Sequence, residues 1–577
     1  MDYQPRLDDI GTILFKVLDG PKYLQALECH AQTDADLMRQ VLDQAGKFVG
    51  EQVAPLQRCG DEIGCRWDAG TVTTPPGFRA AYQAFWQAGW PALACAQEDG
   101  GQGLPAVLDA IVFEMLSGAN HGWTMAPALL HGAYECIRHH ASDALKTTYL
   151  EKVASGEWLV TMCLTEPDAG SDLGLVRTRA TTQADGSYQL AGTKIFISGG
   201  EHDLCDNIVH LVLARLPDAP AGSKGLSLFL APKFLSGGKR NTIVCERIEE
   251  KMGLHGSPTC VLRFDAACGW LVGEANRGLN AMFVMMNAAR LHVGLQGVGL
   301  LEAAWQKADA YSRERRQMRA PRADGASGGG PDLIAEHPAM RRILDTQRAW
   351  IDGGRVLGYY TAIQLDIAKH HPDAAQRDIA QRWCTLVTPV LKAAFTQQAF
   401  QGGSECLQVL GGYGYVREWG IEQIVRDARV SMIYEGTNEI QAIDLLVRKV
   451  LSDGGAGLGA LLAELGAALD IRELQQSIVL RRFAALQMLT AKLVSACRAD
   501  ATVGYWVAED FLRATAIALI GWAWMKIQLA TGTDATLPGN GERWVAPADA
   551  VRRWILPEFD MRLSIIAKRI AVNSGAP

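Results

Sequence analysis

The spacing of apolar residues changes twice along this 577-residue chain, and these changes limit the folds open to it. Residues 34–157 and 279–452 repeat their apolar side chains at the period of an amphipathic helix. Between them, residues 158–278 contain short runs of Val, Ile, Leu and Phe, separated by turn dipeptides such as Asp185-Gly186. The pattern predicts a mainly α-helical protein with a central β domain, either a small barrel or a sandwich.

The same pattern divides the chain into five segments and predicts where strands lie. The segments are an N-terminal extension (1–33), an N-terminal helical domain (34–157), a middle β domain (158–278), a C-terminal helical bundle (279–452) and an additional helical domain (460–577). Strands are expected over Trp158–Thr165, Tyr188–Ser198, Asn207–Leu216, Leu226–Phe234 and Cys260–Trp270. Two glycine-rich stretches, 320–332 and 453–459, are predicted to be a flexible loop and a hinge.

Charge and composition exclude several classes of protein. The net charge of −7 provides no basic surface for nucleic acid or anionic lipid. The first residues lack the basic and apolar regions of a signal peptide, and no apolar run reaches the length of a membrane span. The 13 cysteines form no Cys-x-x-Cys pair, and no histidines cluster at ligand spacing. We therefore expect free thiols, a cytoplasmic protein and no metal site.

One carboxylate in the segment 434–441 is a candidate catalytic group. Gly436 and Thr437 mark the start of a helix, so Glu435 is expected at or just before its N-terminus, beside the ring of Tyr434. An acid at this position can simply offset the helix dipole, which stabilises a helix by up to about 1 kcal/mol. Alternatively, an apolar pocket can raise its pKa and make it a general base. The octapeptide alone leaves both interpretations open.

Two motifs of the β domain could hold a flat or anionic ligand. In the segment 162–172 a strand ends in proline and a Gly-Ser-Asp turn, which frees backbone N–H groups. Further on, the ring of Phe196 and the hydroxyl of Ser198 share one face of a strand, which suits a flat cofactor. A simple tight turn and an ordinary barrel face remain alternatives for these two motifs.

Two more motifs lie at predicted helix ends in the C-terminal helical bundle (279–452). The segment 313–319 carries four arginines, which can form a solvated face or a phosphate clamp. The segment 408–414 ends a helix in a Gly-Gly-x-Gly pattern, and glycines of this kind allow close approach of a ligand. Neither motif is specific by itself.

Six motifs taken together resemble the acyl-CoA dehydrogenase flavoprotein family over residues 35–450. They are Thr-Glu-Pro-x-Ala-Gly-Ser-Asp (165–172), Phe-Ile-Ser-Gly-Gly (196–200), Lys-Met-Gly (251–253), Glu-Arg-Arg-Gln (314–317), Gln-Val-Leu-Gly-Gly (408–412) and Tyr-Glu-Gly-Thr-Asn-Glu-Ile-Gln (434–441). The N-terminal extension and the tail resemble a longer bacterial subgroup, which includes 3-methylmercaptopropionyl-CoA dehydrogenases of dimethylsulfoniopropionate degradation. The resemblance implies an N-terminal helical domain, a small β-barrel, a C-terminal four-helix bundle and an extra helical domain.

The resemblance also implies a reaction, the FAD-dependent dehydrogenation of an acyl-CoA thioester to the trans-2-enoyl-CoA. 3-Methylmercaptopropionyl-CoA is one candidate substrate. Glu435 matches the base that removes the α-proton while the β-hydrogen leaves as hydride to flavin N5, and Ser171, Arg290 and Glu435 match substrate-binding positions. The positions that match FAD-binding residues are Met162, Leu164, Thr165, Ser171, Phe196, Ser198, Arg315, Gln317, Gln408, Gly412, Thr437 and Glu439.

The resemblance to the family also implies a subunit partner and an electron acceptor, and it leaves two alternative functions open. Arg315, Gln317, Gln408 and Gly412 match positions that reach the FAD of a neighbouring subunit, so a homodimer or a dimer of dimers is expected. Electron-transfer flavoprotein is the expected acceptor of electrons. The alternatives are an acyl-CoA oxidase that uses oxygen and a non-catalytic flavoprotein that binds DNA. The acidic chain and its near-neutral tail argue against the second, because binding to duplex DNA depends on clustered Lys and Arg.

Overall fold

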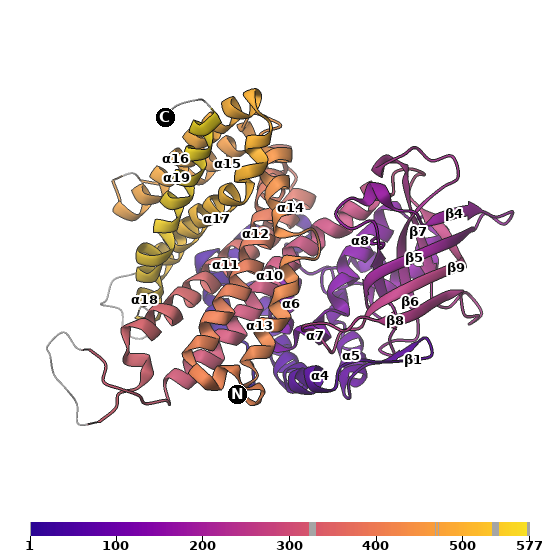
Figure 1. The fold of residues 1–577 in the computed structure, drawn as a ribbon, viewed down its shortest axis with the longest axis horizontal. Coiled ribbons are helices and arrows are strands. Elements are labelled where there is room, and N and C mark those ends of the chain that lie inside the picture. Colours follow the sequence, from indigo (N-terminus) through magenta and orange to yellow (C-terminus); the bar gives the residue numbers. More distant parts are fainter. Residues whose placement is uncertain (1, 322–329, 468, 471, 533–541, 574–577) are drawn as a thin grey trace.

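In the computed structural model the described residues are 2–321, 330–467, 469–470, 472–532 and 542–573. The strands of the β domain gather on one side of the molecule, and long helices fill its centre (Figure 1). The helices closest to the C-terminus cover the side of the long helices that faces away from the strands (Figure 1). The predicted class, mainly α-helical with a central β domain, is confirmed.

The N-terminal part is helical except for one short hairpin. Asp34 begins the main amphipathic helix by accepting a hydrogen bond from Leu37 N at 2.8 Å, which satisfies a free helix donor. The antiparallel strands β1 (Arg66–Asp68) and β2 (Thr71–Thr73) interrupt the helices, so the expectation of helices alone was wrong here. The helices are α1 (Leu7–Gly11), α2 (Gly20–Gln25), α3 (Ala35–Phe48), α4 (Gln57–Ile63), α5 (Phe78–Gln87), α6 (Ala106–Ala119), α7 (His121–Thr124), α8 (Leu130–His140) and α9 (Asp143–Ala154).

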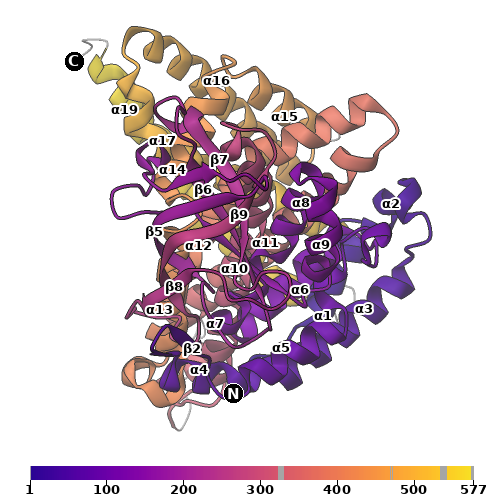
Figure 2. The same ribbon diagram turned by 90° about the vertical axis from the view of Figure 1, so that its right-hand side faces the viewer.

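The middle part is a closed β structure, which lies in front of the long helices in Figure 2. Its strands are β3 (Leu159–Cys163), β4 (Arg179–Thr182), β5 (Tyr188–Ser198), β6 (Ile208–Arg215), β7 (Leu226–Pro232), β8 (Ile243–Ile248) and β9 (Thr259–Val272). β6 pairs with β7, β7 with β9, β9 with β5, β5 with β4, and β4 returns to β6. A separate apolar cluster that includes Val212, Phe229 and Leu262 fills the inside of this barrel. The prediction omitted β4 and β8.

Three long helices form the centre of the molecule. α10 packs against both α11 and α12, and also against α6 and α8 of the N-terminal part. The helices of this region are α10 (Gly278–Ser312), α11 (Pro338–His370), α12 (Ala374–Val409), α13 (Ile421–Arg429) and α14 (Asn438–Ile443), which continues as a π-helix over Asp444–Val450. Because α10 ends at Ser312, the arginine-rich segment follows the helix instead of ending it, contrary to expectation. Most of the predicted loop 320–332, namely 322–329, lies outside the described residues.

The last helices cover one face of this bundle. They are α15 (Ala456–Gly466), α16 (Leu474–Ala499), α17 (Thr502–Thr531), α18 (Glu542–Ala550) and α19 (Leu556–Asn573). α15 begins inside the stretch 453–459, so the predicted hinge is wrong in its second half. α17 packs against α11 and α14, and the indole of Trp524 donates to Ala349 O at 2.8 Å. Within the described ranges, no helix combines the length and the apolar character that a membrane crossing needs.

A buried ion network joins the N-terminal extension, the bundle and the last helices. Asp9 of α1 pairs with Arg543 of α18 at 2.9 Å, and Asp352 of α11 pairs with the same arginine at 2.5 Å. Arg348 of α11 pairs with Asp352 at 2.6 Å and with Asp9 at 3.7 Å. Each of these charges therefore has at least two partners, which offsets the cost of removing it from water.

A loop of the β domain is fixed against α13, one of the elements that lead to the candidate base. Leu254 N donates a hydrogen bond to Asp427 Oδ1 at 2.6 Å. A Cβ atom on Gly253 would lie 2.6 Å from that carboxylate oxygen and 2.8 Å from the carbonyl carbon of Arg426. Only glycine therefore allows this contact, which gives the Lys-Met-Gly motif a structural role between the β domain and α13.

Candidate active site

Glu435 lies in the short connection between α13 and α14. Its φ is 54°, in the left-handed region, and Gly436 follows with a φ of 81°. A residue other than glycine held in this conformation costs on the order of 1–3 kcal/mol, and such strain clusters at functional sites. Thr437 caps α14 by accepting a hydrogen bond from Ile440 N at 3.4 Å, so Glu435 precedes the helix as predicted.

Side chains from three helices hold this turn. Gln441 of α14 donates to Glu435 O at 2.9 Å, and the ammonium of Lys392 of α12 donates to Gly436 O at 2.8 Å. The hydroxyl of Tyr434 donates to Gln296 Oε1 of α10 at 2.7 Å. The first two bonds fix the backbone at and after Glu435, and the third holds the side chain of the preceding residue, so together they limit the positions that the Glu435 side chain can take.

The surroundings of Glu435 favour the ionisation behaviour of a general base. Burial raises the pKa of its carboxyl to about 7, while the charges of Arg290 and Lys392 act in the opposite direction. The residue nevertheless keeps a partly exposed edge, which leaves room for an approaching group. An acid that only offsets a helix dipole at the surface would keep an ordinary pKa of about 4.3. The general-base interpretation is therefore the better supported of the two.

Arg290 and Lys392 approach the turn from α10 and α12. Lys392 is fully buried, also donates to Asn438 Oδ1 at 3.0 Å, and has its pKa lowered to about 7 by burial. Arg290, a predicted substrate-binding residue, pairs with Asp444 Oδ2 at 3.3 Å. The charge of Arg290, and that of Lys392 when it is protonated, stabilises the ionised form of the Glu435 carboxyl.

The first ligand motif of the β domain lies beside β5. Met162 belongs to β3, whereas Leu164 and Thr165 follow the end of that strand. The ammonium of Lys194 donates to Leu164 O at 2.9 Å, and Ile195 N donates to Thr165 O at 2.9 Å. These two bonds place the strand end next to the second motif on β5.

Phe196 occupies an irregular point of β5. Its φ is 58°, and the pairing of β5 with β9 is interrupted between Lys194 and Ile197. The ring of Phe196 is 60% exposed, whereas Ser198 farther along the strand is partly buried. An exposed aromatic ring held by a β-bulge offers a stacking surface for a flat group. Ser171 lies in an exposed turn after the first motif.

Four predicted FAD residues from two distant segments line one pocket of about 450 Å³. Arg315 and Gln317 follow the end of α10, and Gln408 and Gly412 lie at the end of α12. The guanidinium carbon of Arg315 lies 6.0 Å from the centre of the Tyr413 ring. A guanidinium beside a glycine-rich backbone is well suited to a phosphate group.

Comparison with known proteins places these features in one family. Models of the acyl-CoA dehydrogenase N-terminal, middle and C-terminal domains match residues 36–157, 161–267 and 276–450. The chain is 40% identical over 575 residues to 3-methylmercaptopropionyl-CoA dehydrogenase of Ruegeria pomeroyi, with 97% of each chain covered. This chain belongs to the acyl-CoA dehydrogenase family. It is therefore an oxidoreductase that acts on acyl-CoA thioesters, and FAD is its cofactor.

Further relatives share both the length and the fold of this acyl-CoA dehydrogenase. The broad-specificity linear acyl-CoA dehydrogenase FadE5 of Mycobacterium tuberculosis is 34% identical, covering 90% of this chain and 89% of its own. The structure of Caenorhabditis elegans ACDH-11 in complex with C11-CoA matches with a TM-score of 0.75 and 21% identity over 99% of this chain and 96% of its own. The structure of acyl-CoA dehydrogenase from Bacillus anthracis complexed with FAD matches with a TM-score of 0.73 and 19% identity, over 98% of this chain and 95% of its own. These two structures share the fold almost throughout, including the last helices.

The acyl-CoA dehydrogenase presents its predicted site residues in three groups. The turn at Glu435 adjoins Arg290, the motifs of the β domain meet through Lys194, and a third group lines the pocket at the ends of α10 and α12. Next to the first group, Glu439 is exposed, and the hydroxyl of Thr437 lowers its pKa by hydrogen bonding.

Sequence reasoning missed three residues that support the candidate base. Lys392, Gln296 and Gln441 all bond to the turn at Glu435 or to its neighbour Tyr434. One signal was available, because a lysine inside the apolar run 390–395 indicates a buried and paired cation. The two glutamines gave no comparable signal.

Proposed function

We propose that this chain converts a short acyl-CoA thioester to its trans-2-enoyl-CoA with Glu435 as the base, and that 3-methylmercaptopropionyl-CoA is its preferred substrate. The observation that carries the proposal is the state of Glu435. The residue is partly exposed and sits in a strained and anchored turn, and burial raises the pKa of its carboxyl to about 7. The identity of 40% over almost the whole chain to an enzyme named for that substrate supports the choice of acyl group.

Glu435 accepts the α-proton of the thioester. A base with a pKa near the working pH is about half ionised there, and its ionised form binds a proton strongly. The positive charges of Arg290 and Lys392 favour the ionised carboxylate before the proton moves. The bonds from Gln441 and Lys392 to the turn hold the carboxylate near the substrate, which lowers the entropic part of the barrier.

The residues of the other two groups fit FAD. FAD, when bound, supplies the acceptor for the two electrons and the hydrogen that leave the β-carbon. The exposed ring of Phe196 and the nearby hydroxyls of Thr165 and Ser198 offer stacking and hydrogen bonds to a flat heterocycle. Arg315 and the glycine backbone around Gly412 offer a binding site for phosphate.

The assembly and the electron acceptor form part of the same proposal. The family positions matched by Arg315, Gln317, Gln408 and Gly412 contact a neighbouring subunit, which supports a homodimer or a dimer of dimers. We place the enzyme in the cytoplasm and expect electron-transfer flavoprotein as its acceptor. Comparing turnover under air with turnover by a dye acceptor under argon separates this dehydrogenase from an oxidase, because only an oxidase turns over rapidly with oxygen.

The test of the base is Glu435→Gln. The variant is expected to purify with yellow FAD, because the residue is not needed to hold the cofactor. Substrate-dependent bleaching of the flavin should slow by about 10²–10⁴-fold, since the amide cannot take the α-proton. Anaerobic stopped-flow absorbance measures this rate.

Glu418→Gln is the matched control, because Glu418 is an exposed glutamate and the change is chemically the same. It should bleach at the rate of the unmodified enzyme. Bleaching of Glu435→Gln at that same rate would remove Glu435 from the mechanism.

A further inference from the structure

A buried ion pair joins the two ligand motifs of the β domain. Glu166 directly follows Thr165 in the first motif, and Lys194 lies on β5, two residues before Phe196 of the second. Lys194 Nζ lies 2.9 Å from Glu166 Oε1, and the two side chains are 0% and 6% exposed. Removing both charges from water costs about as much free energy as their attraction provides, so net stability does not explain such a pair.

Glu166 connects three segments of the β domain. Its carboxylate accepts hydrogen bonds from Arg177 N at 2.7 Å, from Thr178 N at 3.0 Å and from the Thr178 hydroxyl at 2.5 Å. Its backbone exchanges two further bonds with Ala169, at 2.9 and 3.0 Å, which close the turn that leads to Ser171. One residue therefore holds the end of the first strand, this turn and the segment before β4.

Lys194 joins this acid to the backbone of the strand end. Its ammonium also donates to Leu164 O at 2.9 Å, and the N–H of the next residue, Ile195, donates to Thr165 O at 2.9 Å. Burial lowers the pKa of Lys194, and the charge of Glu166 acts in the opposite direction. Two bonds from β5, one of them charge-assisted and therefore stronger than a bond between neutral groups, hold residues 164–165.

The same bonds lie at the start of the bulge that exposes Phe196. The pairing of β5 with β9 is interrupted between Lys194 and Ile197, and Phe196 between them has a φ of 58°. A residue other than glycine keeps such a conformation only where the surrounding structure holds it. Contacts to residues 164–166 therefore replace the interrupted pairing on one side of the bulge.

We propose that Lys194 and Glu166 are positioning residues for FAD, which hold the strand end 164–165 and the bulge at Phe196 in fixed relative positions so that both contact one flavin ring. This inference rests on the FAD site proposed above. Neither residue is among the positions that the family resemblance matches to the cofactor. Both side chains are too deeply buried to reach a ligand at the surface of the domain, so they act through the backbone that they hold.

The test removes the pair in two steps and measures the melting temperature and FAD release separately. Lys194→Met leaves the Glu166 carboxylate buried without its cation, so the melting temperature of the holoenzyme should fall. Lys194→Met combined with Glu166→Gln leaves no lone charge and should recover most of that loss. Both variants should release FAD about ten-fold faster than the unmodified holoenzyme, because Leu164 O has lost its charge-assisted bond. Flavin fluorescence, which rises as FAD leaves the protein, measures the rate, and a folded variant that purifies without FAD counts as accelerated release.

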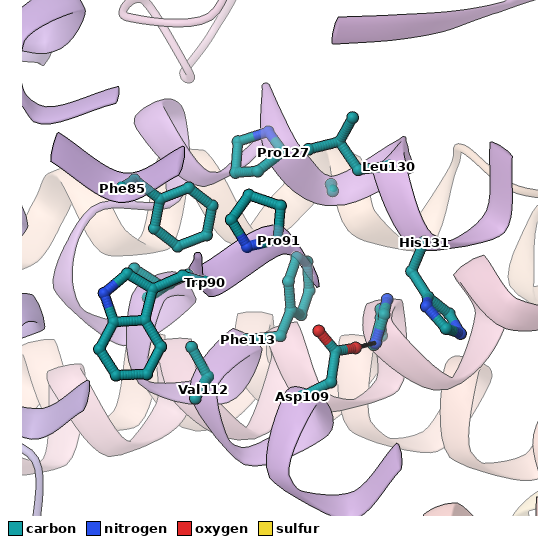
Figure 3. A pocket seen from close by; sticks show the side chains of 12 residues that line it. Phe85, Trp90, Pro91, Asp109, Val112, Phe113, Pro127, Leu130 and His131 are labelled. Carbon is teal, nitrogen blue, oxygen red and sulfur yellow. Dashed lines mark hydrogen bonds and ion pairs between the residues drawn. The ribbon is translucent and has the colours of Figure 1, made fainter. Parts of the chain in front are cut away.

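His292→Leu is the matched control, because it also deprives a carboxylate of its partner but does so outside the β domain. His292 Nε2 lies 3.0 Å from Asp109 Oδ2, on the wall of a small cavity among α6, α8 and α10 (Figure 3). The variant should lower the melting temperature and leave the rate of FAD release unchanged. Equal acceleration in His292→Leu and Lys194→Met would show that FAD release follows general stability, which overturns the proposal.

Visible circular dichroism of the bound flavin gives a readout that stability alone does not move. The flavin bands report the asymmetric surroundings of the ring, so they should change in the double variant and stay unchanged in the control. Unmodified bands or an unmodified release rate in the double variant overturn the proposal. If the unmodified chain binds no FAD at all, the FAD site proposed above fails as well; if it binds FAD and only the variants fail to respond, the site stands without the positioning pair.

Glu166→Gln alone keeps the test available if the double variant does not fold. The amide oxygen can still accept from Thr178 N, and the amine of Lys194 can still donate to Leu164 O without a full charge. FAD release should therefore accelerate only about three-fold, since a bond between neutral groups is weaker than a charge-assisted one. An unchanged release rate in this variant overturns the proposal.

Discussion

The raised pKa of Glu435 determines how flavin reduction should respond to pH. In the proposed mechanism the carboxylate is the active form, and burial raises its pKa to about 7. The rate of reduction by substrate should therefore rise as pH increases through about 7 and level off above it, in a series measured between about pH 5 and pH 9. Stopped-flow absorbance gives the profile. A rate that is already maximal at about pH 5 would mean that the carboxyl keeps an ordinary pKa.

Removing the cation at Lys392 should move that profile. Because the charge of Lys392 lowers the pKa of Glu435, Lys392→Met is expected to shift the midpoint upward by roughly one unit. The variant also loses the bond to Gly436 O, so the plateau rate should fall. A residue with a purely structural role would change the plateau without the midpoint. Lys369→Met, which removes an exposed lysine paired with Glu135, serves as the control and should leave the midpoint in place.

At the residue scale, the sequence indicated Glu435 as a candidate base but did not indicate the residues that hold its turn. The segment 434–441 placed a carboxylate at a helix start, and the other five motifs favoured its interpretation as a base. Lys392 and Gln296 act on it only because α10 and α12 pack side by side, and no local pattern encodes that contact. The sequence and the family resemblance therefore predicted a candidate base and Arg290, and missed Lys392, the other cation that acts on the pKa of Glu435.

The pocket at the ends of α10 and α12 leads to a prediction about cofactor retention. Arg315→Ala removes a guanidinium from the pocket, and losing one charge-assisted bond to phosphate should weaken FAD binding about ten-fold or more. FAD content after gel filtration measures the effect. Arg313→Ala is the control, because Arg313 pairs with Asp309 at 2.9 Å and does not line the pocket. Equal FAD retention in both variants would contradict a phosphate clamp at Arg315.

At the scale of elements, regular patterns were predictable and irregular ones were not. The expected long strands correspond to β3, β5, β6, β7 and β9, whose apolar runs are continuous or alternating. β4 has one buried residue, and β8 carries the exposed residues Glu246 and Arg247. Neither segment therefore contains the apolar run from which the other strands were predicted. Phe196 was recognised as a ring on a strand, but the bulge that exposes it depends on pairing with β9. The five-segment division of the chain stays a prediction.

The ion network at Asp9 leads to a prediction about the stability of the whole molecule. Burial alone would raise the pKa of Asp9, but Arg348 and Arg543 hold it below its ordinary value. The stabilisation is therefore complete above the unfolded pKa of about 3.9 and is lost as acid protonates the carboxyl. Asp9→Ala leaves the buried Arg348 and the partly buried Arg543 with one partner fewer each and should destabilise the protein by about 2–3 kcal/mol near neutral pH.

Thermal and denaturant unfolding of the full chain near neutral pH measure this loss. Asp36→Ala is the control, since Asp36 makes only an exposed pair with Arg39 and should cost no more than about 0.5 kcal/mol. Equal stability of the two variants would show that the network contributes little. Sequence could not predict this network, because its members come from α1, α11 and α18 and carry no shared motif.

The pairing of Asp9 with Arg543 also sets an order of events during synthesis. The ribosome releases α1 first and α18 near the end, with almost the whole polypeptide between them. Until then the nascent chain holds an acid whose final partner has not yet been translated. The last native contact of the first helix can therefore form only after nearly all of the protein has emerged.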